Sequence, residues 1–199
     1  TRDTAWLALE VGYRLEQIEF EQNSLTVLVD AAGDPVVTWL AGVQLRGDDP
    51  AGVRPLAAEL LDTYARQLTG YRSVEGELYT VLAEPLDLFG PLVGFVVFGL
   101  PITDADAETL GRIAGGEVCL VAGELCAAGT AGARDRLQPL LPELEGNGVR
   151  TVRAAGERWA IVAEPLMAER PQDGRMVMAV PLNEVLAPFH RIRGALALA

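Results

Sequence analysis

The chain has 199 residues, of which 50% are hydrophobic and 22% charged, which is enough apolar material for one large domain or two small ones and excludes a disordered protein. All 16 basic residues are arginines, and 28 carboxylates leave a formal net charge of -12. A surface of this charge repels phosphate backbones, so we expect no nucleic-acid partner. With one histidine, two serines and two cysteines, the sequence predicts no metal site, no cofactor and no catalytic triad, and therefore no enzyme.

The first half of the chain begins with helical spacing and continues with strands. An apolar stripe predicts a long leading helix, and its members are Leu7, Val11, Leu15 and Ile18. Two apolar runs, 25–30 and 35–40, flank the turn 31–34 and predict a pair of strands. A second helical stripe follows and stops at Gly70; it consists of Leu56, Leu60, Tyr64 and Leu68.

The most informative feature is an internal repeat with an offset of 80 residues. Residues 76–101 (GELYTVLAEPLDLFGPLVGFVVFGLP) and 156–181 (GERWAIVAEPLMAERPQDGRMVMAVP) are identical at ten of 26 positions without a gap. Each copy is typical of a hairpin, with a glycine turn, a β-rich run that ends at Pro85 or Pro165, a loop and a second run. The runs are so continuously apolar that we expect both faces of the sheet to be covered, or one face to pack on helices.

The second half of the chain repeats the order of the first. Residues 104–114 predict a helix that has Thr103 as its N-cap. Residues 117–121 and 124–128 predict a hairpin that turns at Ala122–Gly123. Helical spacing interrupted by prolines follows, and then comes the second copy of the repeat.

A predicted exit helix starts at about Asn183, and its apolar stripe consists of Val185, Phe189, Ile192 and Leu196. The tail 194–199 is uniformly apolar and is either the start of a transmembrane helix or the end of an alanine-rich one. The sequence has no starting methionine and no leader, which predicts a piece of a longer protein. The duplication predicts two modules, residues 1–102 and 103–199.

This tandem order of helix, two strands, helices and three strands resembles the double Cache family of sensor domains, whose modules are PAS-like. The resemblance covers the chain from about Trp6 to Ile192. Its motifs are the two strands that end in Ala-Glu-Pro-Leu, the strands 94–101 and 174–181, and the exit 182–188. It implies an α+β fold of two tandem PAS-like modules, each an antiparallel sheet with flanking helices, joined to long N- and C-terminal helices.

The resemblance also implies a function. It implies the extracytoplasmic sensory domain of a bacterial transmembrane signalling protein, such as a histidine kinase, diguanylate cyclase or chemoreceptor, on the periplasmic face of the inner membrane. It further implies a small-molecule ligand such as a carboxylate or an amino acid, a homodimer through the terminal helices, a membrane tether, and a membrane-distal first module. The Arg-x-Trp-Tyr run of the amino-acid-binding branch is missing, so the ligand residues of that branch do not carry over. The alternative is a cytoplasmic GAF- or PAS-type regulatory and dimerisation module without a ligand.

A ligand pocket is implied between the sheet and the segment that joins its second and third strands. The first module has the longer joining segment, 41–70, and more polar aromatic side chains, with arginines that could pair with a carboxylate. The expected ligand-binding residues are Trp39, Tyr64, Arg66, Tyr71, Arg72 and Tyr79. The second module offers chiefly Trp159, with Arg153 and Arg175. The alternative is that these aromatic side chains simply fill the core.

Cys119 and Cys126 are directly opposed if the hairpin turns at Ala122–Gly123, which is within reach of a disulfide. They form a disulfide in an extracytoplasmic domain, or they are two small buried side chains, which is the simpler interpretation. His190 is expected to be a partly exposed helix residue rather than a pH sensor. Glu84 and Glu164 are expected to be equivalent strand ends in a duplicated fold rather than a catalytic pair.

Overall fold

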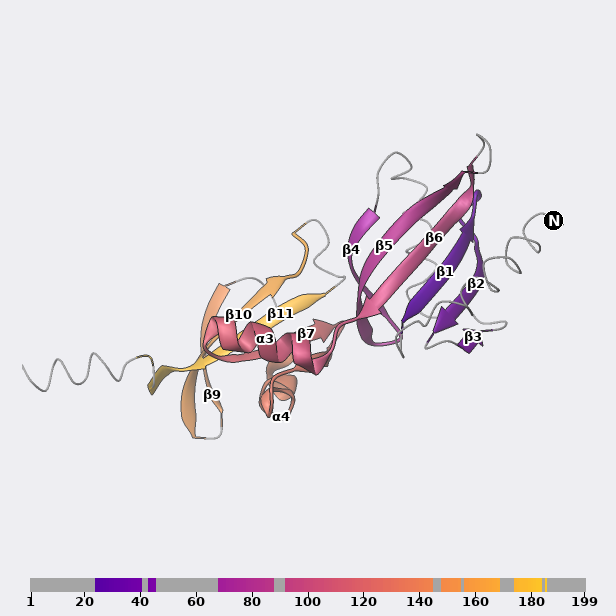
Figure 1. Ribbon diagram of the computed structural model, residues 1–199. Coiled ribbons are helices and arrows are strands. Elements are labelled where there is room, and N and C mark those ends of the chain that lie inside the picture. Colours follow the sequence, from indigo (N-terminus) through magenta and orange to yellow (C-terminus); the bar gives the residue numbers. More distant parts are fainter. Residues whose placement is uncertain are drawn as a thin grey trace, which may run out of the picture. The chain divides into compact units, whose positions relative to one another are not determined.

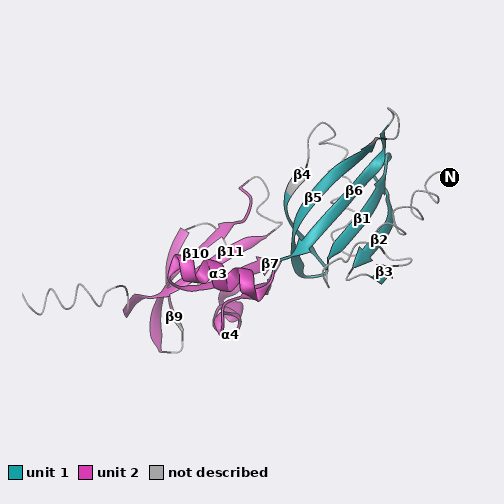
Figure 2. Ribbon diagram, viewed as in Figure 1, with its two compact units in different colours: residues 1–102 teal, residues 103–199 magenta. Residues whose placement is uncertain are grey.

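The computed structural model describes residues 24–40, 43–45, 68–87, 92–144, 148–154, 156–168, 174–183 and 185 (Figure 1). The chain forms two compact units, residues 1–102 and 103–199, and each is described by itself (Figure 2). The expected leading helix, the helical segment 56–67 and the exit helix beyond residue 185 lie outside the described residues, as do His190 and the apolar tail.

The first unit contains a six-stranded antiparallel sheet with the order β3-β2-β1-β6-β5-β4. Its strands are β1 (Leu25–Asp30), β2 (Pro35–Leu40), β3 (Val43–Leu45), β4 (Leu68–Val74), β5 (Glu77–Asp87) and β6 (Leu92–Pro101). β1 and β2 coincide with the predicted runs 25–30 and 35–40, and β5 and β6 form where the repeat predicts strands, which confirms that these four segments are strands.

Two details of this sheet differ from the sequence predictions. Leu68 and Gly70, expected at the end of a helix, belong to β4, because pairing with β5 overrides the helical spacing. β5 does not end at Pro85 but continues to Asp87. Within the described residues, the pairing of β4 with β5 runs from Glu77 to Ala83 and does not include Pro85. A strand tolerates a proline where pairing does not need its missing N–H.

The second unit contains a five-stranded antiparallel sheet with the order β8-β7-β11-β10-β9. Its elements are α3 (Asp104–Ala114), β7 (Glu117–Ala122), β8 (Leu125–Gly129), α4 (Ala133–Leu137), the 3-10 helix η1 (Gln138–Glu143), β9 (Gly148–Ala154), β10 (Glu157–Pro165) and β11 (Arg175–Pro181). α3 begins after Thr103 as predicted. The backbone N–H of Thr103 donates to the Asp106 carboxylate at 2.8 Å, and the helix ends at Gly115 in the left-handed conformation.

The sequence repeat is also a repeat of sheet topology. Without β3, the two sheets have the same strand order, with β9, β10 and β11 in the places of β4, β5 and β6. The pairing register recurs as well, because Tyr79 is opposite Pro101 and Trp159 is opposite Pro181. The units are therefore two copies of one topology, and a residue in one can be compared with its equivalent in the other.

Apolar side chains are buried on both faces of each sheet, which agrees with the continuous apolar runs. In the first unit, one face carries a core that includes Val27 and Val97, and the opposite face carries Leu28 and Val96. In the second unit, α4 and η1 pack on the face that carries Trp159. α3 runs across the other face of that sheet, where it lies in front of the strands in Figure 1.

The β7–β8 hairpin turns one residue later than predicted. Gly123 and Glu124 form the turn, with Gly123 at a φ of 60°, and the register shifts between Leu120 and Val121. Cys126 is therefore opposite Val121 and not opposite Cys119. Glycine supplies the positive φ at either central position of a two-residue turn, so the sequence is compatible with both placements.

Candidate functional site

Arg72 and Tyr79 form a buried polar pair on the first sheet. They are directly opposite each other on β4 and β5, so both side chains lie on the face that carries Val27 and Val97. Arg72 is 4% exposed and Tyr79 is 2% exposed. Because burial of a guanidinium is costly and arginine is rarely buried to this extent, this pair is the strongest candidate for ligand recognition in the first unit.

Both side chains of the pair are hydrogen-bond donors at neutral pH. Nη1 of Arg72 donates to the carbonyl oxygen of Tyr71 at 2.5 Å, which holds the guanidinium against β4. Burial raises the pKa of Tyr79, and the Glu77 carboxylate raises it further, so the phenol keeps its proton. A guanidinium and a phenol on neighbouring strands are donors of the kind that bind a carboxylate.

The other expected ligand-binding residues do not gather on this face. Trp39 packs in the apolar cluster on the opposite face of the sheet. Tyr71 precedes Arg72 on β4, and its side chain lies on that opposite face because side chains alternate along a strand. Tyr64 and Arg66 lie outside the described residues. The alternation of side chains along a strand is enough to place Tyr71 and Arg72 on opposite faces. The sequence could not show this, because it predicts the end of a helix just before Tyr71 and not a strand.

The equivalent position of the second unit holds different residues. Trp159 takes the place of Tyr79, and Val152 takes the place of Arg72 with the same cross-strand pairing. Val152 packs with the apolar cluster of its unit. The fold therefore accepts an apolar side chain at this position, and the buried arginine of the first unit is not a requirement of the topology.

Arg136, on α4, supplies the cation beside Trp159. Its guanidinium lies 5.8 Å from the centre of the indole ring. Nε of Arg136 also donates to the Glu117 carboxylate at 2.9 Å, and this hydrogen bond raises the pKa of Arg136. Of the arginines expected near Trp159, Arg175 shares its face of the sheet, whereas Arg153 lies on the opposite face. The cation beside Trp159 is thus already neutralised by Glu117.

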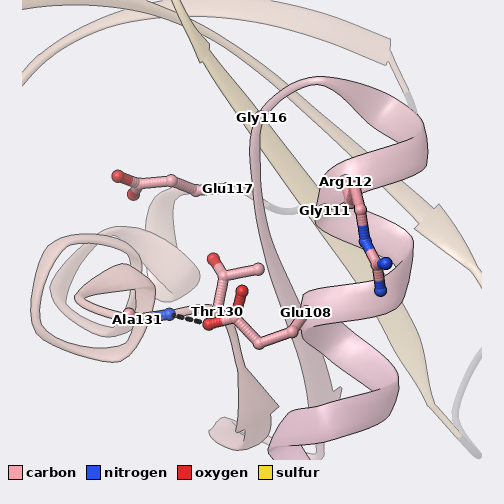
Figure 3. A pocket seen from close by; sticks show the side chains of 7 residues that line it. All are labelled: Glu108, Gly111, Arg112, Gly116, Glu117, Thr130 and Ala131. Carbon is pink, nitrogen blue, oxygen red and sulfur yellow. Dashed lines mark hydrogen bonds between the residues drawn. The ribbon is translucent and has the colours of Figure 1, made fainter.

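A hollow of ≈ 480 Å³ opens between α3, the start of β7 and the loop that joins β8 to α4 (Figure 3). It is lined by Glu108, Gly111, Arg112, Gly116, Glu117, Thr130 and Ala131. Its carboxylates bind groups of the same unit, since Glu108 accepts the backbone N–H of Ala131 at 2.6 Å and Glu117 pairs with Arg136. The sequence does not predict this hollow because its walls come from separate segments. Because its carboxylates already bind groups of the same unit, the hollow is a weaker candidate for a ligand site than the Arg72–Tyr79 pair.

Cys119 and Cys126 form a disulfide, so the simpler interpretation of two buried thiols is wrong. The two Cα atoms are 5.7 Å apart, and the bond links residues that are diagonal and not directly opposite in the β7–β8 hairpin. Cys119 is 0% exposed and Cys126 is 6% exposed. The cross-link thus lies inside the core of the second unit.

No helix in the described part of the chain is long and apolar enough to cross a membrane. No group of three or more histidine, cysteine, aspartate or glutamate side chains there could hold a metal ion.

No family model and no curated protein matches the chain. Among solved structures, the chain is similar to the ligand-binding domain of Mlp24 with asparagine, at 11% identity and a TM-score of 0.46 over 82% of this chain and 70% of that one. It is similar to the ligand-binding domain of the Pseudomonas aeruginosa PAO1 amino acid chemoreceptor PctB in complex with L-Arg, at 17% identity and a TM-score of 0.42 over 82% and 73% of the two chains. It is also similar to the ligand-binding domain of the Pseudomonas fluorescens chemoreceptor CtaA in complex with L-isoleucine, at 17% identity and a TM-score of 0.46 over 82% and 71%.

All three structures are ligand-binding domains, the class of protein to which the sequence resemblance points. Their TM-scores are below 0.5, so the likeness carries no function over to this chain.

Proposed function

We propose that the chain is the extracytoplasmic sensory domain of a bacterial transmembrane signalling protein, such as a chemoreceptor, histidine kinase or diguanylate cyclase. Its first unit binds a small molecule that carries a carboxylate, with amino acids as the first class to test. Arg72 and Tyr79 hold the carboxylate, and the exit helix relays the signal. The first unit is membrane-distal, the second is membrane-proximal, and the terminal helices form a homodimer.

The observation that carries this proposal is the burial of Arg72 beside Tyr79. The equivalent residue of the second unit is Val152, so the fold itself does not need a charge at this position. Burying a guanidinium costs free energy that an apolar residue would not cost. Recognition of an anionic group by Arg72 and Tyr79 gives this buried charge a function.

The disulfide supports the extracytoplasmic location. Disulfides persist in oxidising compartments such as the periplasm and are rare in the bacterial cytoplasm. The alternative of a cytoplasmic regulatory module therefore has to account for Cys119–Cys126. The full-length gene separates the two readings, because the proposed location requires apolar spans of about 20 residues on both sides of the domain.

Binding is tested by thermal-shift screening against amino acids and simple carboxylates, followed by calorimetry of each hit. Hydrogen bonds to charged groups contribute about 1.5–3 kcal/mol, so Arg72→Gln is expected to weaken binding by about 10- to 100-fold. Tyr79→Phe removes a neutral donor and is expected to weaken binding by about 3- to 10-fold.

Trp39→Phe is the matched control, because Trp39 lies on the other face of the same sheet and is expected to leave the affinity unchanged. Circular dichroism shows whether each variant is folded. The proposal fails if no carboxylate gives saturable binding, or if folded Arg72→Gln and Tyr79→Phe proteins bind a confirmed ligand as tightly as the wild type.

A further inference from the structure

Arg153 on β9 lies directly opposite Arg158 on β10. These two strands stand at one end of the strand order of the second sheet (Figure 1). Both side chains are exposed. They share the face of the sheet that is opposite the face of Trp159. Cβ atoms of directly opposed residues are about 4.5–5.5 Å apart, so the two guanidinium groups can reach the same small ligand.

The pair is unfavourable for the fold when nothing binds to it. Like charges that are directly opposite in a sheet destabilise it. Within the described part of the chain, neither residue forms an ion pair, whereas Arg134 pairs with Asp104 and Arg136 pairs with Glu117. The chain has 28 carboxylates, yet the residue opposite each of these arginines is the other arginine and not a carboxylate.

The topology does not require these arginines. The equivalent cross-strand pair of the first unit is Ser73 and Leu78, and Leu78 is 0% exposed. The same position in the duplicated sheet is therefore compatible with small polar and apolar residues. Two exposed cations therefore share one register position in a protein with a net charge of -12, where they form a local positive site that does not stabilise the sheet.

The arrangement of donors indicates the chemistry of that ligand. One guanidinium fork satisfies the two oxygens of a carboxylate, whereas two neighbouring forks match a group that has more oxygens and a higher charge. We propose that Arg153 and Arg158 bind the phosphate group of a soluble metabolite or of a lipid headgroup. The high negative charge of the whole chain opposes long polyanions, so the ligand carries one phosphate group or a few.

The binding test uses the whole chain in a phosphate-free buffer at low salt. Titration with inorganic phosphate, followed by amide chemical shifts, is expected to give saturable changes in β9 and β10. Each arginine contributes about 1 kcal/mol near an anionic group, so Arg153→Gln or Arg158→Gln is expected to weaken binding about fivefold. Arg112→Gln, which removes an exposed arginine from α3, is expected to leave binding unchanged.

Vesicles distinguish the two sources of phosphate. The protein is sedimented with vesicles of phosphatidylglycerol and phosphatidylcholine. If the wild type co-sediments with them and Arg153→Gln does not, the ligand is a lipid headgroup. Binding of inorganic phosphate without binding of these vesicles assigns it to a soluble ligand.

Reversing the charge of Arg153 distinguishes a role in phosphate binding from a role in stabilising the sheet. Arg153→Glu replaces a repulsive cross-strand pair by an attractive one, so it is expected to raise the unfolding temperature in phosphate-free buffer while it abolishes phosphate binding. The proposal is overturned if phosphate binding does not saturate, if acetate binds as tightly as phosphate, if Arg112→Gln weakens binding as much as Arg153→Gln, or if folded Arg153→Glu still binds phosphate.

Discussion

Reduction of the Cys119–Cys126 disulfide is expected to destabilise the second unit by a measurable amount. The two cysteines are separated by 7 positions, and closing a loop of about 8 residues corresponds to about 2.5 kcal/mol of lost chain entropy in the unfolded state. For a unit of this size, 1 kcal/mol shifts the unfolding temperature by about 4–8 °C. Complete reduction is therefore expected to lower the unfolding temperature of the second unit by about 10–20 °C.

The assay is thermal unfolding with and without a phosphine reductant, followed by circular dichroism. Both cysteines are buried, so reduction is expected to be slow in the folded protein and fast in denaturant. The chain has only these two cysteines, and a thiol titration in denaturant therefore counts the disulfide directly. The double variant Cys119→Ala/Cys126→Ala is the control, and its unfolding must not respond to the reductant.

Two results contradict this reasoning. One is the detection of two free thiols in protein that was purified from the periplasm and denatured without reductant. The other is an unfolding temperature that does not change after the thiol titration has shown complete reduction. The first result would also remove the support that the disulfide lends to the extracytoplasmic location.

Two further predictions concern single residues of the first unit. The pKa of Tyr79 is raised in the folded state, so above pH 10 the unfolded chain loses a proton that the native state keeps. The free energy of unfolding therefore falls as the pH rises from 10 to the folded-state pKa. The slope is up to about 1.4 kcal/mol per pH unit. Urea unfolding at several alkaline pH values is expected to show this slope in the wild type, and an equal slope in Tyr79→Phe would exclude Tyr79 as its source. Gly94→Ala is expected to destabilise the first unit by about 3 kcal/mol or more, because the added Cβ overlaps the backbone oxygen of Val29 on the neighbouring strand. A Gly94→Ala protein as stable as the wild type in urea would show that β1 and β6 are not packed as described.

The repeat was the most reliable guide to the fold. Gly94 recurs as Gly174, and the strands around both positions form where the sequence predicts them. The cap of α3 at Thr103 was also predictable, because a capping box needs only residues that are close in sequence. The sequence wrongly predicted that β5 ends at Pro85. The free energy that a proline costs in a strand depends on whether a neighbouring strand needs its missing N–H, which the sequence does not show.

The candidate site was predictable in its chemistry but not in its geometry. Arg72 and Tyr79 were among the expected residues, and so were Trp39 and Tyr71, which lie on the other face of the sheet. Sequence composition identifies side chains that could bind a carboxylate. It does not show which of them share a face until the strand register is known, because a shift of one residue reverses every side chain.

By itself, the sequence determined that the protein is a tandem duplication, where the repeated strands and α3 lie, and that residues for a catalytic triad are scarce. These features depend on local patterns and on self-similarity. Only the tertiary structure decided that Arg72 is buried beside Tyr79, that Cys119 and Cys126 are joined although they are not directly opposite, and that Arg153 faces Arg158. Each of these results depends on the register between strands, which is set by turns and bulges whose position a sequence pattern leaves open by one residue.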